Sequence, residues 1–200
     1  MDDGVYTVKS GYWLATHLRN NNPEFDPPPG ETEQKEAIWK MKTTPKIKHF
    51  LWRALTKTLA TGSILASRRI TNDPQCKRCC AAEETREHLF FGCIYAQAVW
   101  RATHVSRPEF FNPNLSFEAK LKILIQIHND KMNDPLRRQL PLLTLWRIWK
   151  SRNLLVYQRR SSTWEQDAHK ATTDAFDWIP RQNSRRDTRT QLNHGCPEDG

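Results

Sequence analysis

The sequence of 200 residues predicts a mainly α-helical fold: a small helical domain stapled by one metal site, with further C-terminal helices and a disordered tail. Three observations support this prediction. Apolar residues recur at helical spacing through most of the chain. Four of the five cysteines fall between residues 76 and 93, where a metal ion could hold helices together. Residues 181–200 have almost no apolar side chains and are therefore expected to be disordered.

The first forty residues contain turn signals between short periodic segments. We expect an extended piece over residues 3–10 and a helix over residues 11–19. A surface loop over residues 20–30 and a second helix over residues 31–40 should follow. The loop follows from its asparagines and prolines, because proline lacks a backbone donor and restricts the residue before it. The second helix is expected to carry Ile38 and Trp39 inward.

A basic amphipathic helix is predicted from Pro45 to Lys57. Thr44 is a typical helix cap, and proline fits the first helical position because no intrahelical donor is needed there. The apolar positions that follow have helical spacing: Ile47, Phe50, Leu51, Ala54 and Leu55. Trp52 lies to one side of this stripe, where a core role is favoured over the alternative of base stacking.

Further helices are expected in the rest of the chain, over residues 61–69, 95–104, 117–129, 135–160 and 162–178. In the helix expected over residues 95–104, Val99 faces the core and Trp100 lies on a flank. In the helix expected over residues 135–160, Pro141 should begin or kink the main segment, because a proline within a helix removes a hydrogen bond. The last helix should end at Trp178, before Pro180.

Three cysteines and one histidine have the spacing of a zinc site, C-x2-C-x8-H-x4-C: Cys76, Cys79, His88 and Cys93. A tight turn lets the first two thiols grip one ion. Residues five apart on an unbroken α-helix point about 140° away from each other, so His88 and Cys93 need a break between them. Gly92 supplies one. The sequence therefore predicts one structural Zn²⁺ with these four ligands.

Other interpretations of the cysteines stay open. Cys80 could replace Cys79 as a ligand, although the x2 spacing suits the turn better. The cluster could also consist of ordinary buried cysteines, but packing gives no reason for such clustering. A disulfide framework is disfavoured by the odd cysteine count and the lack of a secretory signal, which together favour a reducing compartment inside the cell, nucleus or cytoplasm.

Charge is polarised along the chain, which has a formal net charge of +9. Residues 40–72 and 135–162 contain many basic residues and no aspartate or glutamate. Such blocks favour a polyanionic partner, RNA or DNA, although they could merely keep helix faces soluble. The candidate phosphate contacts are Lys46, Lys48, Arg53, Lys57, Lys77 and Arg78. No apolar run is long enough to cross a bilayer, so we expect no membrane partner.

Several short motifs follow one another along the chain: GVYTVKSGY from residue 4, IWK from 38, PKIKHFLWR from 45, CKRC from 76, Glu84, HLFF from 88, Cys93 and Trp100. Together they resemble the zinc-binding domain that follows the reverse transcriptase in plant LINE-type non-LTR retroelements. The resemblance covers residues 3–105 and implies the same four zinc ligands. The sequence LWRIWKSRN from residue 145 also resembles the segment that leads toward an RNase H-like domain in such elements.

These patterns divide the chain into a zinc-binding domain over residues 3–105, a helical extension over residues 106–178 and a disordered tail over residues 179–200. The resemblance implies a non-enzymatic module that assists RNA or DNA binding, with the reverse transcriptase or RNase H-like domains of the parent element as partners. The carboxylates that hold catalytic metal ions in both enzymes are missing from this chain. Two alternatives stay open: a decayed fragment without present function, or a module that packs against those domains through Trp13, Trp146 and Trp149.

Overall fold

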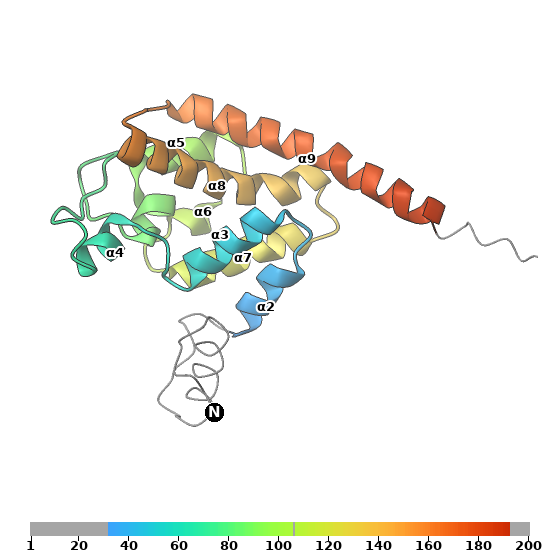
Figure 1. Cartoon of the computed structure of the whole chain (residues 1–200), viewed down its shortest axis with the longest axis horizontal. Helices are drawn as coiled ribbons and strands as arrows, with labels where there is room; N and C mark the ends of the chain where they lie inside the picture. The colour runs from blue at the N-terminus through green and yellow to red at the C-terminus, as the bar shows by residue number, and fades with distance from the viewer. Residues whose placement is uncertain (1–31, 106, 193–200) are drawn as a thin grey trace, which may run out of the picture.

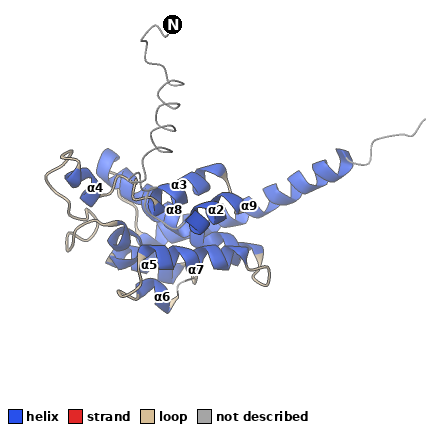
Figure 2. Cartoon of the chain, turned by 90° about the horizontal axis from the view of Figure 1, so that it is seen from below, coloured by secondary structure: helices blue, strands red, loops and turns tan. Residues whose placement is uncertain are grey.

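The structure is a computed structural model that describes residues 32–105 and 107–192, with side chains up to residue 179. The described part is mainly helical, as predicted, and it has no strand (Figures 1 and 2). One isolated bridge pairs Gln75 with Glu83. The elements expected over residues 3–30 lie outside the described residues. The helical elements are α2 (Thr32–Lys40), α3 (Pro45–Leu55), α4 (Gly62–Ser67), the π-helical turn η1 (His88–Gly92), α5 (Ile94–Ala102), α6 (Pro108–Phe111), α7 (Phe117–Asn129), α8 (Pro135–Gln158) and α9 (Trp164–Leu192).

The long helix α8 lies at the centre of the packed helices (Figure 1). It packs against α9 on one side and against α7 and α3 on the other, while α5 contacts both α8 and α9. Phe50 of α3 is buried at the middle of this arrangement, with ring centroids 5.8 Å from Phe90 and 5.3 Å from Trp146. One hydrophobic core is therefore continuous between the chain before residue 105 and the helices after it.

Helix α3 confirms the amphipathic pattern read from the sequence. All five apolar positions predicted to face inward are buried. The helix ends at Leu55 rather than at Lys57, because the backbone reverses at Lys57, whose φ of 57° is left-handed. Trp52 is half-buried and packs against the core, with its ring 6.4 Å from that of His49.

For two tryptophans, Trp39 and Trp100, the burial of the side chain is opposite to the prediction. Trp39 was expected to point inward but is 49% exposed, because α2 buries Gln34 and Ile38, one turn apart, on its inner face. Trp100 was expected on a flank but is completely buried. Its indole N–H donates to the carbonyl oxygen of Phe90 at 2.8 Å, and its ring stacks on Phe91 at 5.9 Å. A partner for the indole nitrogen is what allows full burial of this side chain.

The prolines interrupt the C-terminal helices less than expected. Pro141 is buried inside α8, which continues as one helix from Pro135 to Gln158. Helix α9 was expected to end at Trp178 and to be followed by a disordered tail, but it runs on to Leu192. A proline removes one hydrogen bond without ending the helix around it, and no glycine follows Pro180 before residue 195. Residues 193–200 of the expected tail lie outside the described residues.

His128 at the end of α7 is a buried histidine that gives the fold a pH dependence. It is 1% exposed; its Nδ1 lies 3.2 Å from the carbonyl oxygen of Arg138, and its Nε2 has no partner within the described residues. Burial lowers the pKa of His128 to about 4, and the charges of Arg138 and Lys48 act in the same direction. The neutral ring is therefore the form that fits the folded chain.

We expect the free energy of unfolding to fall as the pH drops from 7 toward 4. The unfolded chain binds a proton at the ordinary histidine pKa, whereas the folded chain resists it, so the contribution is complete above about pH 6.5 and amounts to roughly 3 kcal/mol. Urea unfolding at several pH values measures this slope. His128→Leu is the matched control: it should remove this part of the pH dependence, and an unchanged slope in the variant would contradict the assignment to His128.

Candidate metal centre

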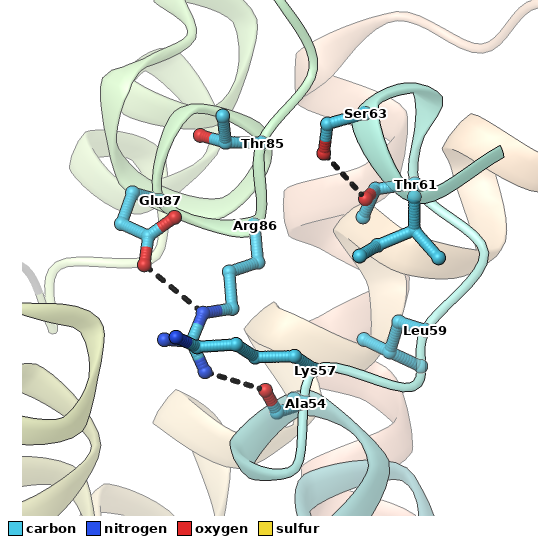
Figure 3. A pocket seen from close by; sticks show the side chains of 9 residues that line it. Ala54, Lys57, Leu59, Thr61, Ser63, Thr85, Arg86 and Glu87 are labelled. Atoms are coloured by element: carbon cyan, nitrogen blue, oxygen red, sulfur yellow. Dashed lines mark hydrogen bonds and ion pairs between the residues drawn. The ribbon is translucent and has the colours of Figure 1, made fainter. Parts of the chain in front are cut away.

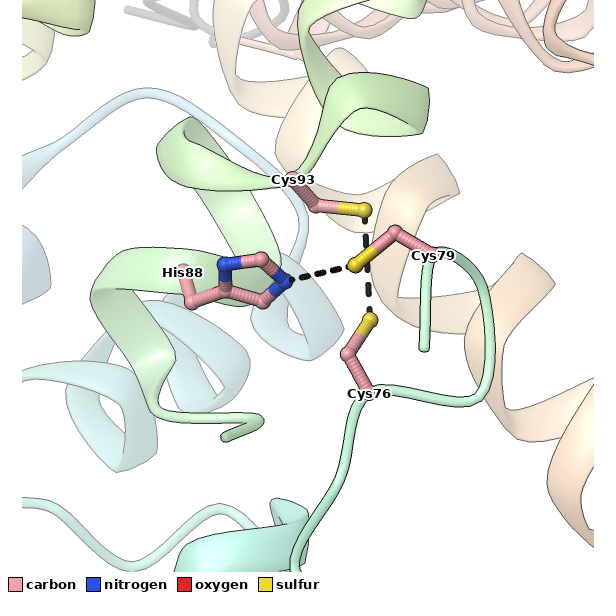
Figure 4. A group of neighbouring side chains, drawn as sticks. All are labelled: Cys76, Cys79, His88 and Cys93. Carbon is pink, nitrogen blue, oxygen red and sulfur yellow. Dashed lines mark hydrogen bonds between the residues drawn. The ribbon is translucent and has the colours of Figure 1, made fainter. Parts of the chain in front are cut away.

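The first two thiols, Cys76 and Cys79, lie on a tight turn, here called the knuckle (Figure 4). The isolated bridge between Gln75 and Glu83 closes the loop that contains this turn. The N–H of Cys76 donates to the carbonyl oxygen of Ala82 at 2.9 Å, and the N–H of Cys80 donates back to the carbonyl oxygen of Cys76 at 2.8 Å. The turn closes with Cys80 in the left-handed region, at a φ of 52°. This reversal aims Cys76 and Cys79 at the same point and leaves Cys80 exposed.

The other two side chains are brought together by the π-helical turn η1. The N–H of Cys93 donates to the carbonyl oxygen of His88 at 2.6 Å, so the turn closes between residues five apart. An α-helix would point these residues away from each other, as the sequence indicated, but the wider π turn puts them on one side. A Cβ at Gly92 would lie 3.4 Å from Nδ1 of His88, an ordinary van der Waals contact, so the available space does not itself require glycine at this position.

The four ligand atoms lie within 4.8 Å of one another (Figure 4). The sulfur atoms of Cys76 and Cys93 are 3.9 Å apart, and the sulfur of Cys79 is 3.2 Å from Nε2 of His88. Zinc–sulfur bonds of about 2.3 Å in a tetrahedron place two sulfurs about 3.8 Å apart, so this spacing fits one Zn²⁺. The structure thus brings together all four of the residues that the sequence pattern selected.

The thiol of Cys76 donates a hydrogen bond to the sulfur of Cys93. The hydrogen bond with Cys93, followed by burial, raises the pKa of Cys76 to about 12. The same hydrogen bond is the main cause that lowers the pKa of Cys93. Because the thiolate is the form that binds zinc, the metal must displace this proton, and zinc affinity should rise with pH.

Comparison with known proteins supports the same assignment. Residues 6–100 match the family described as zinc-binding in reverse transcriptase. This segment is a reverse-transcriptase zinc-binding domain. Its cofactor is one Zn²⁺, for which the Cys3His cluster found among the described residues offers four donor atoms. No curated protein and no solved structure matches the chain.

Arg78, between the two knuckle cysteines of the zinc-binding domain, reaches across to the C-terminal helices. Its guanidinium lies 4.0 Å from the ring centre of Tyr95. It donates to the carbonyl oxygen of Ser162 at 3.0 Å and to that of Ser151 at 3.2 Å. Arg78 therefore fastens the knuckle to α8 and to the α8–α9 connection, a role that sequence reasoning missed because it was considered only as a phosphate contact.

The other candidate phosphate contacts differ in how far their charges are engaged. Lys48 donates to the carbonyl oxygen of Trp39 at 2.7 Å, and Arg53 donates to that of Thr58 at 2.9 Å. Lys77 forms an exposed ion pair with Asp73. Two cations are exposed and have no hydrogen bond or ion pair to another described residue: Lys46 and Lys57. Contact with nucleic acid by any of the six stays a prediction.

A buried ion pair beside the knuckle was not predicted. Glu84 and Arg152 are 1% and 2% exposed, and Nη2 of Arg152 lies 2.5 Å from Oε1 of Glu84. The same oxygen accepts the N–H of Gly62 at 2.8 Å. A Cβ at Gly62 would lie 2.6 Å from the carbonyl oxygen of Pro74, so the chain passes too close for a side chain there. Both charged residues occur in motifs that resemble the family, but no local pattern links residues 68 positions apart.

A pocket of about 220 Å³ lies between α3, α4 and η1 (Figure 3). Its main charged group, Arg86, is satisfied within the fold: it donates to the carbonyl oxygens of Ala54 and Leu55 and pairs with Glu87 and Glu118. The hydroxyls of Thr61 and Ser63 hydrogen-bond to each other in the same wall. The pocket is smaller than typical ligand sites, which begin at about 300 Å³. Lys57 at its edge is exposed and unpaired among the described residues, but the buried guanidinium of Arg86 is already engaged, so the pocket lends no support to a small-molecule site.

Proposed function

We propose that this chain is a non-enzymatic module that helps a reverse transcriptase hold RNA or DNA through contacts to phosphates. The role of zinc in it is structural. Three thiolates and one imidazole occupy all four positions of a tetrahedral ion, whereas catalytic zinc keeps one position open for water or substrate. The zinc-binding domain is accordingly a scaffold, and its function depends on the surface that the scaffold positions.

The single observation that carries the proposal is the acid-free basic surface of α3. Burial of its five apolar side chains turns the charged side chains of this helix outward. No aspartate or glutamate occurs between residues 40 and 72 to neutralise them. A cationic helix face of this kind attracts phosphate backbones without reading their sequence.

The alternative of a packing module is not favoured by the tryptophans that suggested it. Trp149 is buried, with 8% of its surface exposed. Trp146 is half-buried and packs edge-on against Phe50 of α3. Trp13 lies outside the described residues. The two described side chains are thus occupied inside the chain rather than offered to a partner protein.

We expect the zinc-loaded chain to bind a generic single-stranded oligonucleotide with an affinity that falls steeply with salt. Each phosphate contact contributes about 0.7 to the slope of log affinity against log salt, so a few contacts weaken binding roughly tenfold or more between about 50 and 200 mM salt. Fluorescence anisotropy at several salt concentrations, with oligonucleotides of unrelated sequence, measures both properties. Absence of binding at low salt, or binding that does not respond to salt, would contradict the proposal.

A further inference from the structure

We propose that the phosphodiester backbone of the nucleic acid binds across three helices, on a lysine face formed by Lys46 of α3, Lys150 of α8 and Lys170 of α9. This inference rests on the proposed function and names its binding surface. Lys46 belongs to the acid-free block of residues 40–72, and Lys150 belongs to that of residues 135–162. Lys170 lies on α9, outside both blocks.

The packing of α3 against α8 places the first two lysines near each other. Phe50 is the contact point, with its ring 5.3 Å from that of Trp146 and 6.5 Å from that of Trp149. Lys46 precedes Phe50 by one helical turn, and Lys150 follows Trp146 by one turn. Both lysines are exposed at the margin of this contact, so the core aromatic side chains hold their helices in position.

The antiparallel packing of α9 on α8 adds the third lysine. Arg147 of α8 pairs with Asp174 of α9 at 2.5 Å, and nearer the connection Tyr95 hydrogen-bonds to both Ser151 of α8 and Asp167 of α9. In the register that these contacts set, Lys170, one turn before Asp174, lies beside Lys150. Figure 1 shows α9 running alongside α8 over this stretch.

Electrostatics agree with this placement. Burial lowers the pKa of Lys150 most, and the charges of Arg147, Lys46 and Lys170 lower it further, against the opposing effect of Asp174. Cations from three helices therefore act on one ammonium group. Asp174 is engaged by Arg147, and none of the three lysines has a hydrogen bond or ion pair to another described residue. The result is an uncompensated positive charge on one face.

The chemistry of the lysine face favours a phosphate backbone over other anionic partners. Lysines are strongly hydrated point charges that neutralise phosphates without the bidentate geometry used to read bases. Insertion into a membrane surface would require large apolar side chains beside the cations, whereas Trp146 and Trp149 are turned into the core. Cations on three separate helices suit a polymer of regularly spaced charges.

The test compares two triple variants of the full zinc-loaded chain that lose the same net charge. One is Lys46→Gln, Lys150→Gln, Lys170→Gln, and the control is Lys40→Gln, Lys122→Gln, Lys131→Gln, whose lysines are exposed on α2, on α7 and just after α7. With single-stranded RNA and DNA probes, the first variant should lose roughly tenfold or more in affinity at low salt, and its salt slope should fall by about 2. The control should stay close to the unmodified chain.

Each outcome separates the inference from the proposed function. Equal losses in the two variants, with circular dichroism showing intact folds, would overturn the lysine face and leave nucleic-acid binding by the chain in place. An unmodified chain that binds neither probe would overturn both. Vesicles containing phosphatidylserine form a third arm: if the first variant loses binding to vesicles while keeping its affinity for both probes, the face serves a membrane and the inference fails.

Discussion

Replacing Cys76 and Cys79 together by serine is expected to abolish zinc binding and to unfold the region around the knuckle. Metal binding and folding are coupled in such sites, because the ligand geometry does not exist in the unfolded chain, and the coupling is on the order of 10 kcal/mol. This is comparable to the whole stability of a typical domain, about 5 to 15 kcal/mol. Metal analysis of the purified chain, together with circular dichroism, measures both effects.

The matched control for this variant is Cys80→Ser. Cys80 is exposed and points away from the cluster, so its loss should leave one zinc per chain. Full zinc content in the Cys76→Ser, Cys79→Ser chain would contradict the assignment of the site. Cys79→Ser alone tests the remaining alternative, since zinc retained in it but lost after further replacement of Cys80 would show that Cys80 can take the place of Cys79.

Loss of zinc should also loosen contacts beyond the knuckle. Arg78 connects the ligand-bearing turn to the carbonyl oxygens of Ser151 and Ser162. When the turn loosens, this contact loosens with it, and hydrogen exchange should increase at the end of α8 and the start of α9 as well as between residues 76 and 93.

Arg152→Met is expected to destabilise the fold by roughly 3 to 5 kcal/mol. The substitution leaves the carboxylate of Glu84 buried, and the N–H of Gly62 is then the hydrogen-bond donor that remains to it among the described residues. Chemical unfolding of the zinc-loaded chain gives the change directly. The double variant Glu84→Gln, Arg152→Met should recover part of the loss, because it removes the uncompensated charge along with its partner.

The control for this prediction is the exposed ion pair of Lys77 with Asp73, whose side chains are 44% and 53% exposed. Lys77→Met should cost less than about 1 kcal/mol, because solvent screens a surface pair. A loss below about 1 kcal/mol for Arg152→Met as well would mean that the buried pair does not hold the loop of Glu84 against α8.

Local patterns in the sequence were sufficient to predict the cluster of four candidate metal ligands and the helix α3. The x2 spacing requires a tight turn, and the apolar stripe from Ile47 to Leu55 fits only one helical face, so both could be predicted without knowledge of the rest of the fold. The need for a break between His88 and Cys93 was also predictable. The π-helical turn that meets this need was not, because no periodicity distinguishes a π turn of five residues from a glycine-permitted bend.

Features that depend on distant partners could not be read from the sequence. Trp100 is buried because the carbonyl oxygen of Phe90 accepts its indole N–H, and Trp39 is exposed because Ile38 takes the inner position. Glu84, in the loop before η1, pairs with Arg152 of α8. The length of α9 exceeded the prediction because low apolar content indicates that a segment buries little, not that its backbone cannot form helical hydrogen bonds.

The separation of Glu84 from Arg152 imposes an order on the events of synthesis. All four zinc ligands have been added once residue 93 is in place, but the partner of Glu84 comes 68 residues after it. At about 5 to 20 residues per second, the ribosome takes several seconds or more to reach Arg152. During that interval the knuckle can load its ion while Glu84 stays in water. We therefore expect that zinc can bind before α8 is available to pair with Glu84.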